Sequence, residues 1–85
     1  AQILYIESMG DYLKIHTPQQ SHVTYMTMLK FEAMLPSEGF ARIHRSTIVN
    51  TKFIQYIEGN LVMLSGTKLS IGPNYREDFL KSISW

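Results

Sequence analysis

The sequence predicts a single, mainly β domain of 85 residues that carries two short helices. Two features predict this class. Short segments rich in β-branched and aromatic residues follow one another, separated by Gly, Pro, Asn or Asp, as in antiparallel strands joined by turns. Apolar residues recur at helical spacing in only two places. The pattern therefore favours a small antiparallel sandwich or compact barrel decorated with helices.

Three strands are expected in the first part of the chain. They are residues 3–7, 12–17 and 22–27, where β-branched and aromatic residues are frequent. The turn at residues 8–11 contains Gly and Asp, and the loop at residues 18–21 begins with Pro. Both compositions are typical of chain reversals.

A helix of about two turns is expected next, at residues 28–35. Positions 28, 31, 34 and 35 are apolar, which is close to helical spacing. Thr27 is a suitable N-cap because its hydroxyl can accept a hydrogen bond from the first turn, and Pro36 ends the element.

More strands and a second helix are expected in the second half of the chain. The expected strands are residues 40–44, 53–57, 61–64 and 68–71. Residues 47–49 are expected to be extended or part of a tight turn, and residues 72–74 to break the last strand. The second helix is expected at residues 75–83, where apolar side chains recur at helical spacing and Glu77 and Asp78 lie near the start.

Composition limits the possible functions. The absence of cysteine excludes a disulfide scaffold, a thiol nucleophile and a Cys-ligated zinc site. No apolar run reaches the ~18–20 residues of a membrane span and no signal peptide opens the chain, so no membrane association and a cytoplasmic location are expected. The chain begins almost directly on a strand, which indicates a domain cut from a longer protein. A net charge of +1 argues against a purely electrostatic nucleic-acid binder but allows a local basic patch.

Residues 40–52 have the composition of a surface that holds phosphates and reads base edges. The segment contains no acidic residue. Its cationic and polar side chains include Arg42, His44, Arg45, Ser46, Thr47, Asn50 and Lys52. They flank a short apolar pair, Ile48-Val49, in the sequence. A half-buried strand, in contrast, normally spaces its charges along one face.

No enzyme is expected from these residues. His44 and Ser46 are two apart and could share one side of a strand, but a nucleophilic site also needs an orienting acid and an oxyanion hole. No acidic residue occurs within eleven residues after His44, and no Gly-rich turn surrounds Ser46. The minimal parts of a hydrolytic site are therefore missing.

No metal or cofactor is expected either. The three histidines, His16, His22 and His44, lack a ligand spacing, and the carboxylates do not cluster. If residues 18–21 form the hairpin loop, Thr17 faces His22 and His16 faces Val23. His16 and His22 then point to opposite faces of the sheet.

The basic segment also resembles a known family. Residues 40–50 read FARIHRSTIVN and match F-x-R-[IV]-H-R-S-x-[IV]-V-N, the central signature of the LytTR-type DNA-binding domain, the output module of many bacterial response regulators. The blocks ILYIE and GDY before it, and LSIG and YREDF after it, are similar to that family's opening and closing elements. The resemblance implies an elongated β sandwich of stacked small antiparallel sheets with two short helices. It also implies sequence-specific binding of double-stranded DNA by loops in the major groove.

Six polar residues of the segment have an expected role. Arg45 is the expected base reader, since its guanidinium matches guanine O6 and N7 bidentately. His44 either donates to DNA or orients the loop. Arg42, Ser46 and Lys52 are the expected phosphate contacts. Asn50 either joins the DNA-binding residues or holds the loop through bonds to the backbone, with Ile48-Val49 as the apolar anchor beneath it.

The resemblance implies two further DNA loops. One is the first turn, here Met9-Gly10-Asp11, where a carboxylate suits DNA only by accepting from cytosine N4. The other precedes the last helix, where many family members carry an arginine and this chain has Pro73. Asn74 and Arg76 are the nearest replacements, since Asn can pair with adenine and a helix N-terminus suits a phosphate.

The expected partners are double-stranded DNA and a receiver or sensor domain in the parent protein. The isolated domain is expected to be monomeric, and to be dimeric on DNA only through that parent. Two other functions remain open: a small β module that binds proteins, and an RNA-binding β domain, which needs exposed aromatic residues on which bases stack. Convergence of Arg42, Arg45, Lys52 and Arg76 on one exposed face would favour DNA.

Overall fold

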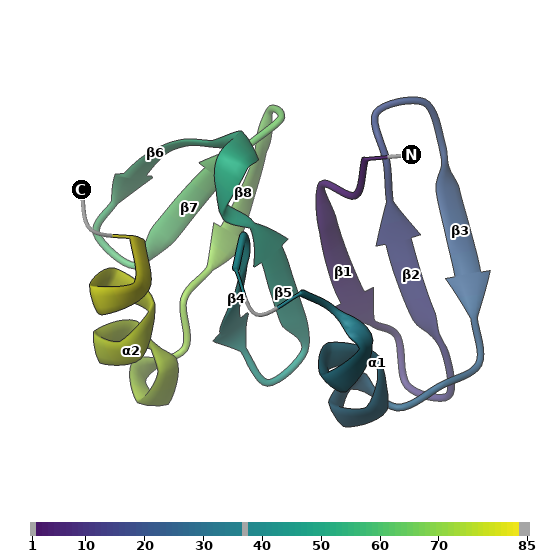
Figure 1. Cartoon of the computed structure of the whole chain (residues 1–85). Coiled ribbons are helices and arrows are strands. Elements are labelled where there is room, and N and C mark those ends of the chain that lie inside the picture. Colours follow the sequence, from purple (N-terminus) through teal and green to yellow (C-terminus); the bar gives the residue numbers. More distant parts are fainter. Residues whose placement is uncertain (1, 37, 84–85) are drawn as a thin grey trace.

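Two antiparallel sheets and two helices make up the structure, a computed structural model that describes residues 2–36 and 38–83 (Figure 1). The larger sheet has five strands in the order β3-β2-β1-β5-β4. These strands are β1 (Tyr5–Ser8), β2 (Leu13–His16), β3 (Ser21–Thr24), β4 (Phe40–His44) and β5 (Thr47–Asn50). Strand β1 therefore pairs with both β2 and β5, and joins the two hairpins of the sheet.

The smaller sheet has three strands in the order β6-β7-β8. They are β6 (Ile54–Glu58), β7 (Leu61–Leu64) and β8 (Thr67–Ser70). A 3-10 helix (Thr51–Phe53) connects the sheets, and the α-helices are α1 (Met28–Met34) and α2 (Pro73–Ile83). The fold class predicted from the sequence, mainly β with stacked antiparallel sheets and two short helices, is confirmed.

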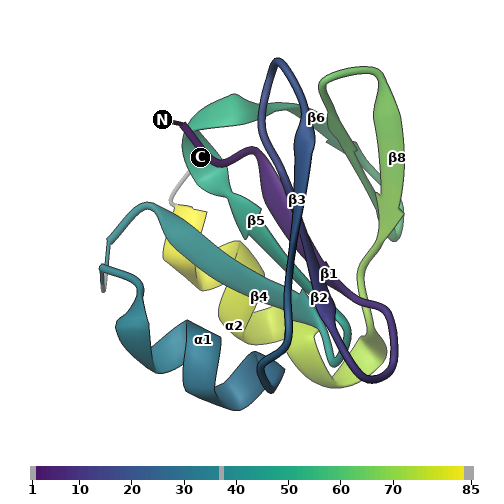
Figure 2. The same cartoon turned by 90° about the vertical axis from the view of Figure 1, so that its right-hand side faces the viewer.

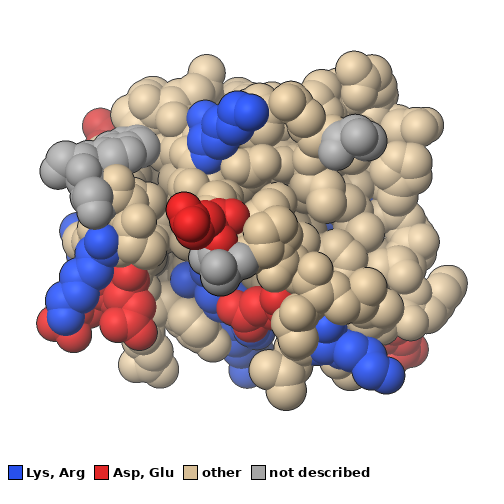
Figure 3. Space-filling model, viewed as in Figure 1, with Lys and Arg blue, Asp and Glu red and all other residues tan. Residues whose placement is uncertain are grey.

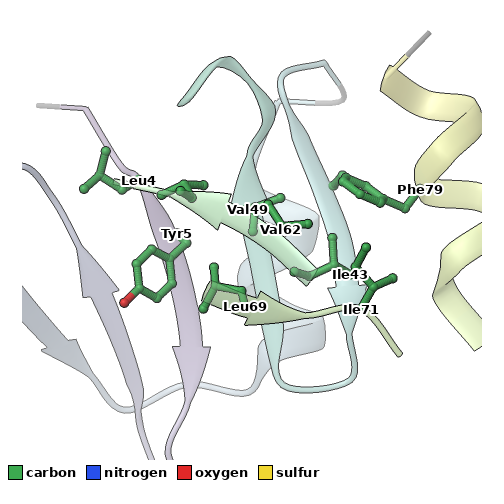
Figure 4. Packing of buried hydrophobic residues seen from close by; sticks show 10 residues of the cluster. Leu4, Tyr5, Ile43, Val49, Val62, Leu69, Ile71 and Phe79 are labelled. Atoms are coloured by element: carbon green, nitrogen blue, oxygen red, sulfur yellow. The ribbon is translucent and has the colours of Figure 1, made fainter. Parts of the chain in front are cut away.

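One hydrophobic core lies between the sheets and extends under α2 (Figure 4). Tyr5 and Val49 of the larger sheet meet Val62 and Leu69 of the smaller one, and Phe79 of α2 closes the core with 2% of its surface exposed. Burial raises the pKa of the Tyr5 phenol, and the nearby Glu7 carboxylate raises it further. The phenol therefore stays protonated.

A second core lies on the opposite face of the larger sheet, under α1. Ile6, Leu13 and Ile48 of the sheet pack against Met28 of the helix. Figure 2 shows the sheet between α1 on one side and β8 on the other. The predicted N-cap is confirmed, because the Thr27 hydroxyl accepts from the Lys30 backbone N–H at 3.1 Å.

Residues 47–49 were expected to be extended or part of a tight turn, and the structure shows the extended alternative. Residues 47–50 form β5, a strand between β1 and β4, and Thr47, Ile48 and Val49 are all buried because a core covers each face of the sheet. A strand covered on both faces lacks the polar–apolar alternation that marks a half-buried strand.

The second helix also begins earlier than predicted. It starts at Pro73, a favourable first helical residue because its fixed φ fits the helix and its missing N–H has no partner there anyway. Asn74 therefore lies within the helix, and the first turn contains no acidic residue, contrary to the expectation for Glu77 and Asp78.

The loop between β2 and β3 is shifted as well. Strand β3 starts at Ser21, so His16 pairs with Ser21 and Ile15 with His22, two residues from the predicted register. A shift by two keeps each side chain on its face, so His16 and His22 still point to opposite faces.

Candidate nucleic-acid interface

Three connections lie along one edge of the molecule, the lower edge in Figure 1. They are residues 9–11 between β1 and β2, residues 44–46 at the β4–β5 hairpin, and residues 72–74 at the start of α2. We call these residues the loop edge. Backbone hydrogen bonds hold the three together, from Ser8 N–H to Ser46 O (2.8 Å) and from Gly72 N–H to Ile43 O (2.7 Å). The sequence motif and the two further loops implied by the resemblance are therefore neighbours in space.

Arg45 stands at the tip of the β4–β5 hairpin. Its side chain is exposed, and among the described residues none makes a hydrogen bond or ion pair with its guanidinium. A guanidinium projected from a tight hairpin presents its fork of donors to a ligand at little cost in broken contacts. The Arg45 side chain is therefore available to a ligand.

Hydrogen bonds fix the tautomer of His44. The backbone N–H of Ser46 donates to Nδ1 of His44 at 3.2 Å, and the Ser46 Oγ lies 2.9 Å from the same nitrogen. A nitrogen that accepts a hydrogen bond carries no proton, so neutral His44 holds its proton on Nε2. The ring therefore orients the hairpin through Nδ1 and keeps one donor for a ligand.

The hairpin and the start of α2 enclose a surface cleft of about 230 Å³. Its lining residues are His44, Arg45, Gly72, Pro73, Asn74 and Tyr75. Gly72 lies close to both rings of the cleft, because a Cβ there would be 3.3 Å from the Tyr75 ring and 3.4 Å from the His44 ring. Asn74 is exposed beside the cleft, so Arg45 and Asn74 can meet one ligand together.

The turn at residues 9–11 extends the loop edge beyond the hairpin. Gly10 has φ +91°, in the left-handed region that glycine adopts without steric cost. Met9 is 45% exposed and Asp11 is exposed. The turn therefore presents its side chains to solvent at the same edge as Arg45.

Residues 1–84 match the family model of the LytTr DNA-binding domain. The chain belongs to this family. It is 29% identical over 85 residues to the sensory transduction protein LytT of Bacillus subtilis (strain 168), covering 93% of this chain and 35% of LytT. It is 32% identical over 75 residues to the transcriptional regulatory protein LytR of Staphylococcus aureus (strain N315), covering 81% of this chain and 30% of LytR.

A solved structure shows the same fold. The LytTr DNA-binding domain of a putative methyl-accepting/DNA response regulator from Bacillus cereus superimposes with a TM-score of 0.90 at 24% identity, covering 98% of this chain and 82% of that one. The LytTr domain described here spans about a third of the length of the curated relatives.

The four basic residues singled out from the sequence do not converge on one face of this LytTr domain. Lys52 is exposed, with Nζ 6.0 Å from the Phe53 ring centroid, but it follows the far end of β5 from Arg45. Since β5 has four residues, its first and last Cα atoms are about 10 Å apart. In Figure 3 lysine and arginine occupy separate areas of the visible face.

Arg76 and Asn50 hold the fold together. The Arg76 Nη1 donates to Gly59 O (2.7 Å) and to Asn60 Oδ1 (3.1 Å), which ties α2 to the β6–β7 turn. The Asn50 Nδ2 donates to Ile3 O at 2.8 Å, and its Oδ1 accepts from the Lys52 backbone N–H at 3.1 Å. Of the two roles left open for Asn50, the structure supports the one within the loop.

Arg42 is also engaged inside the domain. Its Nε donates to His44 O (3.0 Å), its Nη1 to Glu32 Oε1 (2.8 Å) and its Nη2 to Arg45 O (2.5 Å). The side chain is only 20% exposed. The predicted phosphate contact therefore has its donors directed at the protein.

Sequence reasoning missed Lys68. This exposed β8 residue lines an open cleft of about 300 Å³ together with His44 and Ser46 of the hairpin and with Glu7 of β1. It places a cation beside the loop edge. Nothing in the sequence indicated this, because β8 reaches the hairpin only through the packing of one sheet on the other.

The histidines show no sign of a metal site. His16 stacks on the Tyr5 ring (centroids 4.1 Å apart), and its Nε2 lies 2.8 Å from Glu7 Oε1. Within residues 2–36 and 38–83, no three histidine or carboxylate side chains gather to hold an ion.

Proposed function

We propose that this LytTr domain binds double-stranded DNA sequence-specifically through the loop edge, as the output domain of a two-component transcriptional regulator. The observation that carries the proposal is the convergence of residues 9–11, 44–46 and 72–74 on one edge, in a chain whose family model is a DNA-binding domain. A major groove about 12 Å wide admits such protruding turns, and each base pair there shows a distinct set of donors and acceptors.

The proposed contacts are of two kinds: some read the bases, and the others bind phosphates and position the domain on the duplex. Arg45 reads a guanine and Asn74 an adenine from the two sides of their shared cleft. The Nε2–H of His44 and the Lys68 ammonium contact phosphates and so set the register, while the Ser46 hydroxyl holds the His44 ring. The turn at residues 9–11 faces the adjoining part of the groove, where the Asp11 carboxylate can accept from cytosine N4.

RNA binding receives less support. Stacking of single-stranded bases needs an exposed platform of aromatic rings. The most exposed tyrosines are Tyr25, 78% exposed beside α1, and Tyr56, 47% exposed on β6. They belong to different layers of the domain and form no shared platform.

We also propose the setting in which this domain acts. A receiver or sensor domain in the parent protein would control it, and the regulator would act in the cytoplasm. Among the described residues, no helix is long and apolar enough to cross a membrane.

Salt dependence tests the proposal. We expect a duplex selected from a random library by this domain to bind with a slope of log K against log salt concentration of about −2 to −4, because few cations lie near the loop edge. Fluorescence anisotropy at several salt concentrations measures the slope. No enrichment of any sequence, or no binding at low salt, would contradict DNA binding. Preference for an RNA of the same sequence would favour the RNA-binding alternative.

We expect the free domain to be a monomer at micromolar concentration. Its helices are short, with seven residues in α1 and eleven in α2, and offer no heptad seam. Two domains brought together by the parent protein would gain affinity on adjacent half-sites through effective concentration. Sedimentation velocity gives the mass directly. A dimer without DNA would overturn this expectation and point to pairing through the free edge of β3.

A further inference from the structure

We propose that Arg42 positions the Arg45 hairpin without contacting DNA, and that Glu32 on α1 sets the orientation of Arg42. This inference rests on the proposed function and adds a coupling between α1 and the reading loop. It assigns a role to the only arginine of the motif whose side chain points into the domain.

The guanidinium acts as a clamp on the hairpin. Two of its three nitrogens donate to the carbonyls of His44 and Arg45, the residues at the end of β4 and the tip of the turn. Strand pairing is irregular between Arg42 and His44, where the register shifts by one residue. A bulge of this kind re-aims the chain and leaves backbone groups without a ladder partner. Arg42 donates to the His44 and Arg45 carbonyls at and just after this irregularity, and so holds the direction in which the hairpin leaves the sheet.

Glu32 orients the clamp. Its Oε1 accepts from Nη1 of Arg42 at 2.8 Å, and this bond joins Arg42, and through it the hairpin, to α1. A planar guanidinium held at three points has little freedom to rotate. If the carboxylate is removed, Arg42 keeps its charge but loses the partner that holds its plane against the two carbonyls.

The same guanidinium also contacts the start of α2. Its central carbon lies 5.8 Å from the Tyr75 ring centroid, within the range of a cation–π contact. Tyr75 lines the cleft that holds Arg45 and Asn74, and a second cleft of about 320 Å³ beside Arg42 and Glu32. One side chain therefore bridges α1, the reading hairpin and the helix that carries Asn74.

A rival role for Arg42, a phosphate contact restrained by Glu32, makes the opposite prediction. Removal of the Glu32 charge would then free the guanidinium for DNA and strengthen binding. Under the positioning role, Glu32→Gln weakens binding to the selected duplex by about tenfold, the effect of one charged hydrogen bond, and leaves binding to random duplex nearly unchanged. The matched control is Glu58→Gln, which removes the same charge from an exposed residue at the end of β6.

A second variant separates charge from geometry. Arg42→Lys keeps the positive charge, which suffices for a phosphate, but lacks the fork that spans two carbonyls and a carboxylate. We expect it to lose discrimination between selected and random duplex by about tenfold while the salt slope stays unchanged. If Arg42 instead contacted a phosphate, Arg42→Lys would retain discrimination. Arg42→Gln would then reduce the slope of log K against log salt concentration by about one unit.

The readouts distinguish this inference from the proposed function. Urea unfolding confirms that Glu32→Gln and Arg42→Lys are folded, and amide exchange at Arg45 and Ser46 reports the order of the hairpin. We expect faster exchange there in both variants. If the unmodified domain binds its selected duplex and Glu32→Gln binds it equally or more tightly, the positioning role is wrong while DNA binding stands. If the unmodified domain selects no sequence, the proposed function itself fails.

Discussion

Replacement of Arg45 by alanine is expected to weaken binding to the selected duplex by roughly 1–3 kcal/mol, or about 5- to 150-fold, and to change binding to random duplex far less. The reason is that the side chain projects from the hairpin tip with its donors unused by the described part of the fold. Loss of a bidentate pair with guanine removes discrimination at one base position. Anisotropy with the selected duplex, and with variants of each base pair, measures both the loss and its position.

Lys52→Ala is the matched control for Arg45→Ala. It removes the same charge from an exposed side chain, but at the far end of β5 from the loop edge. We expect near-normal affinity for every duplex, whereas the sequence alone had assigned Lys52 to a phosphate. If Arg45→Ala and Lys52→Ala instead lost the same binding free energy as each other, on selected and on random duplex alike, Arg45 would be a general electrostatic contact. The assignment of base reading would then be wrong.

The largest effect on stability is expected at Phe79. Its replacement by alanine should lower the free energy of unfolding by about 3–5 kcal/mol, the usual cost of a cavity left by a buried aromatic ring. The ring is 2% exposed and closes the core between the sheets. Since a domain of this size has a total stability of roughly 4–13 kcal/mol, the variant loses a large share of it. Urea unfolding followed by tryptophan fluorescence or circular dichroism measures the change.

The neighbouring residue supplies the control. Leu80 lies on the same helix but is 38% exposed, so Leu80→Ala should cost less than about 1 kcal/mol. Equal losses in the two variants would show that α2 is held by helix propensity and not by the packing of one ring. DNA binding by folded Leu80→Ala should be normal, because Leu80 does not line the loop-edge cleft.

Much of the fold could be predicted from local signals. Strands β4 and β7 have the predicted bounds, and α1 begins after the predicted cap. These elements follow rules that depend on neighbours in sequence, such as side-chain alternation and capping. Strand β5 was uncertain because its burial comes from two layers supplied by distant segments, α1 on one face and the smaller sheet on the other.

The candidate site was predicted in part. The motif identified the hairpin, and the resemblance identified the other two connections. Composition could not separate a cation that faces solvent from one that bonds to the protein. Arg42 and Arg45 are both arginines of one motif, yet the partner of Arg42 is Glu32, ten positions away along the chain and on another element. Such a distinction requires the tertiary arrangement, and so does the approach of Lys68.

The loop edge has a consequence for how the target of this domain can change. Arg45, Asn74 and residues 9–11 are exposed and lie outside both cores, so substitutions there alter the surface offered to DNA at little cost to folding. Strands β1 and β5, which support these connections, are mostly buried and tolerate few changes. New recognition sequences can therefore evolve one turn at a time on an unchanged scaffold, and a designer could exchange the three turns between relatives while keeping the Arg42–Glu32 clamp that aims the central one.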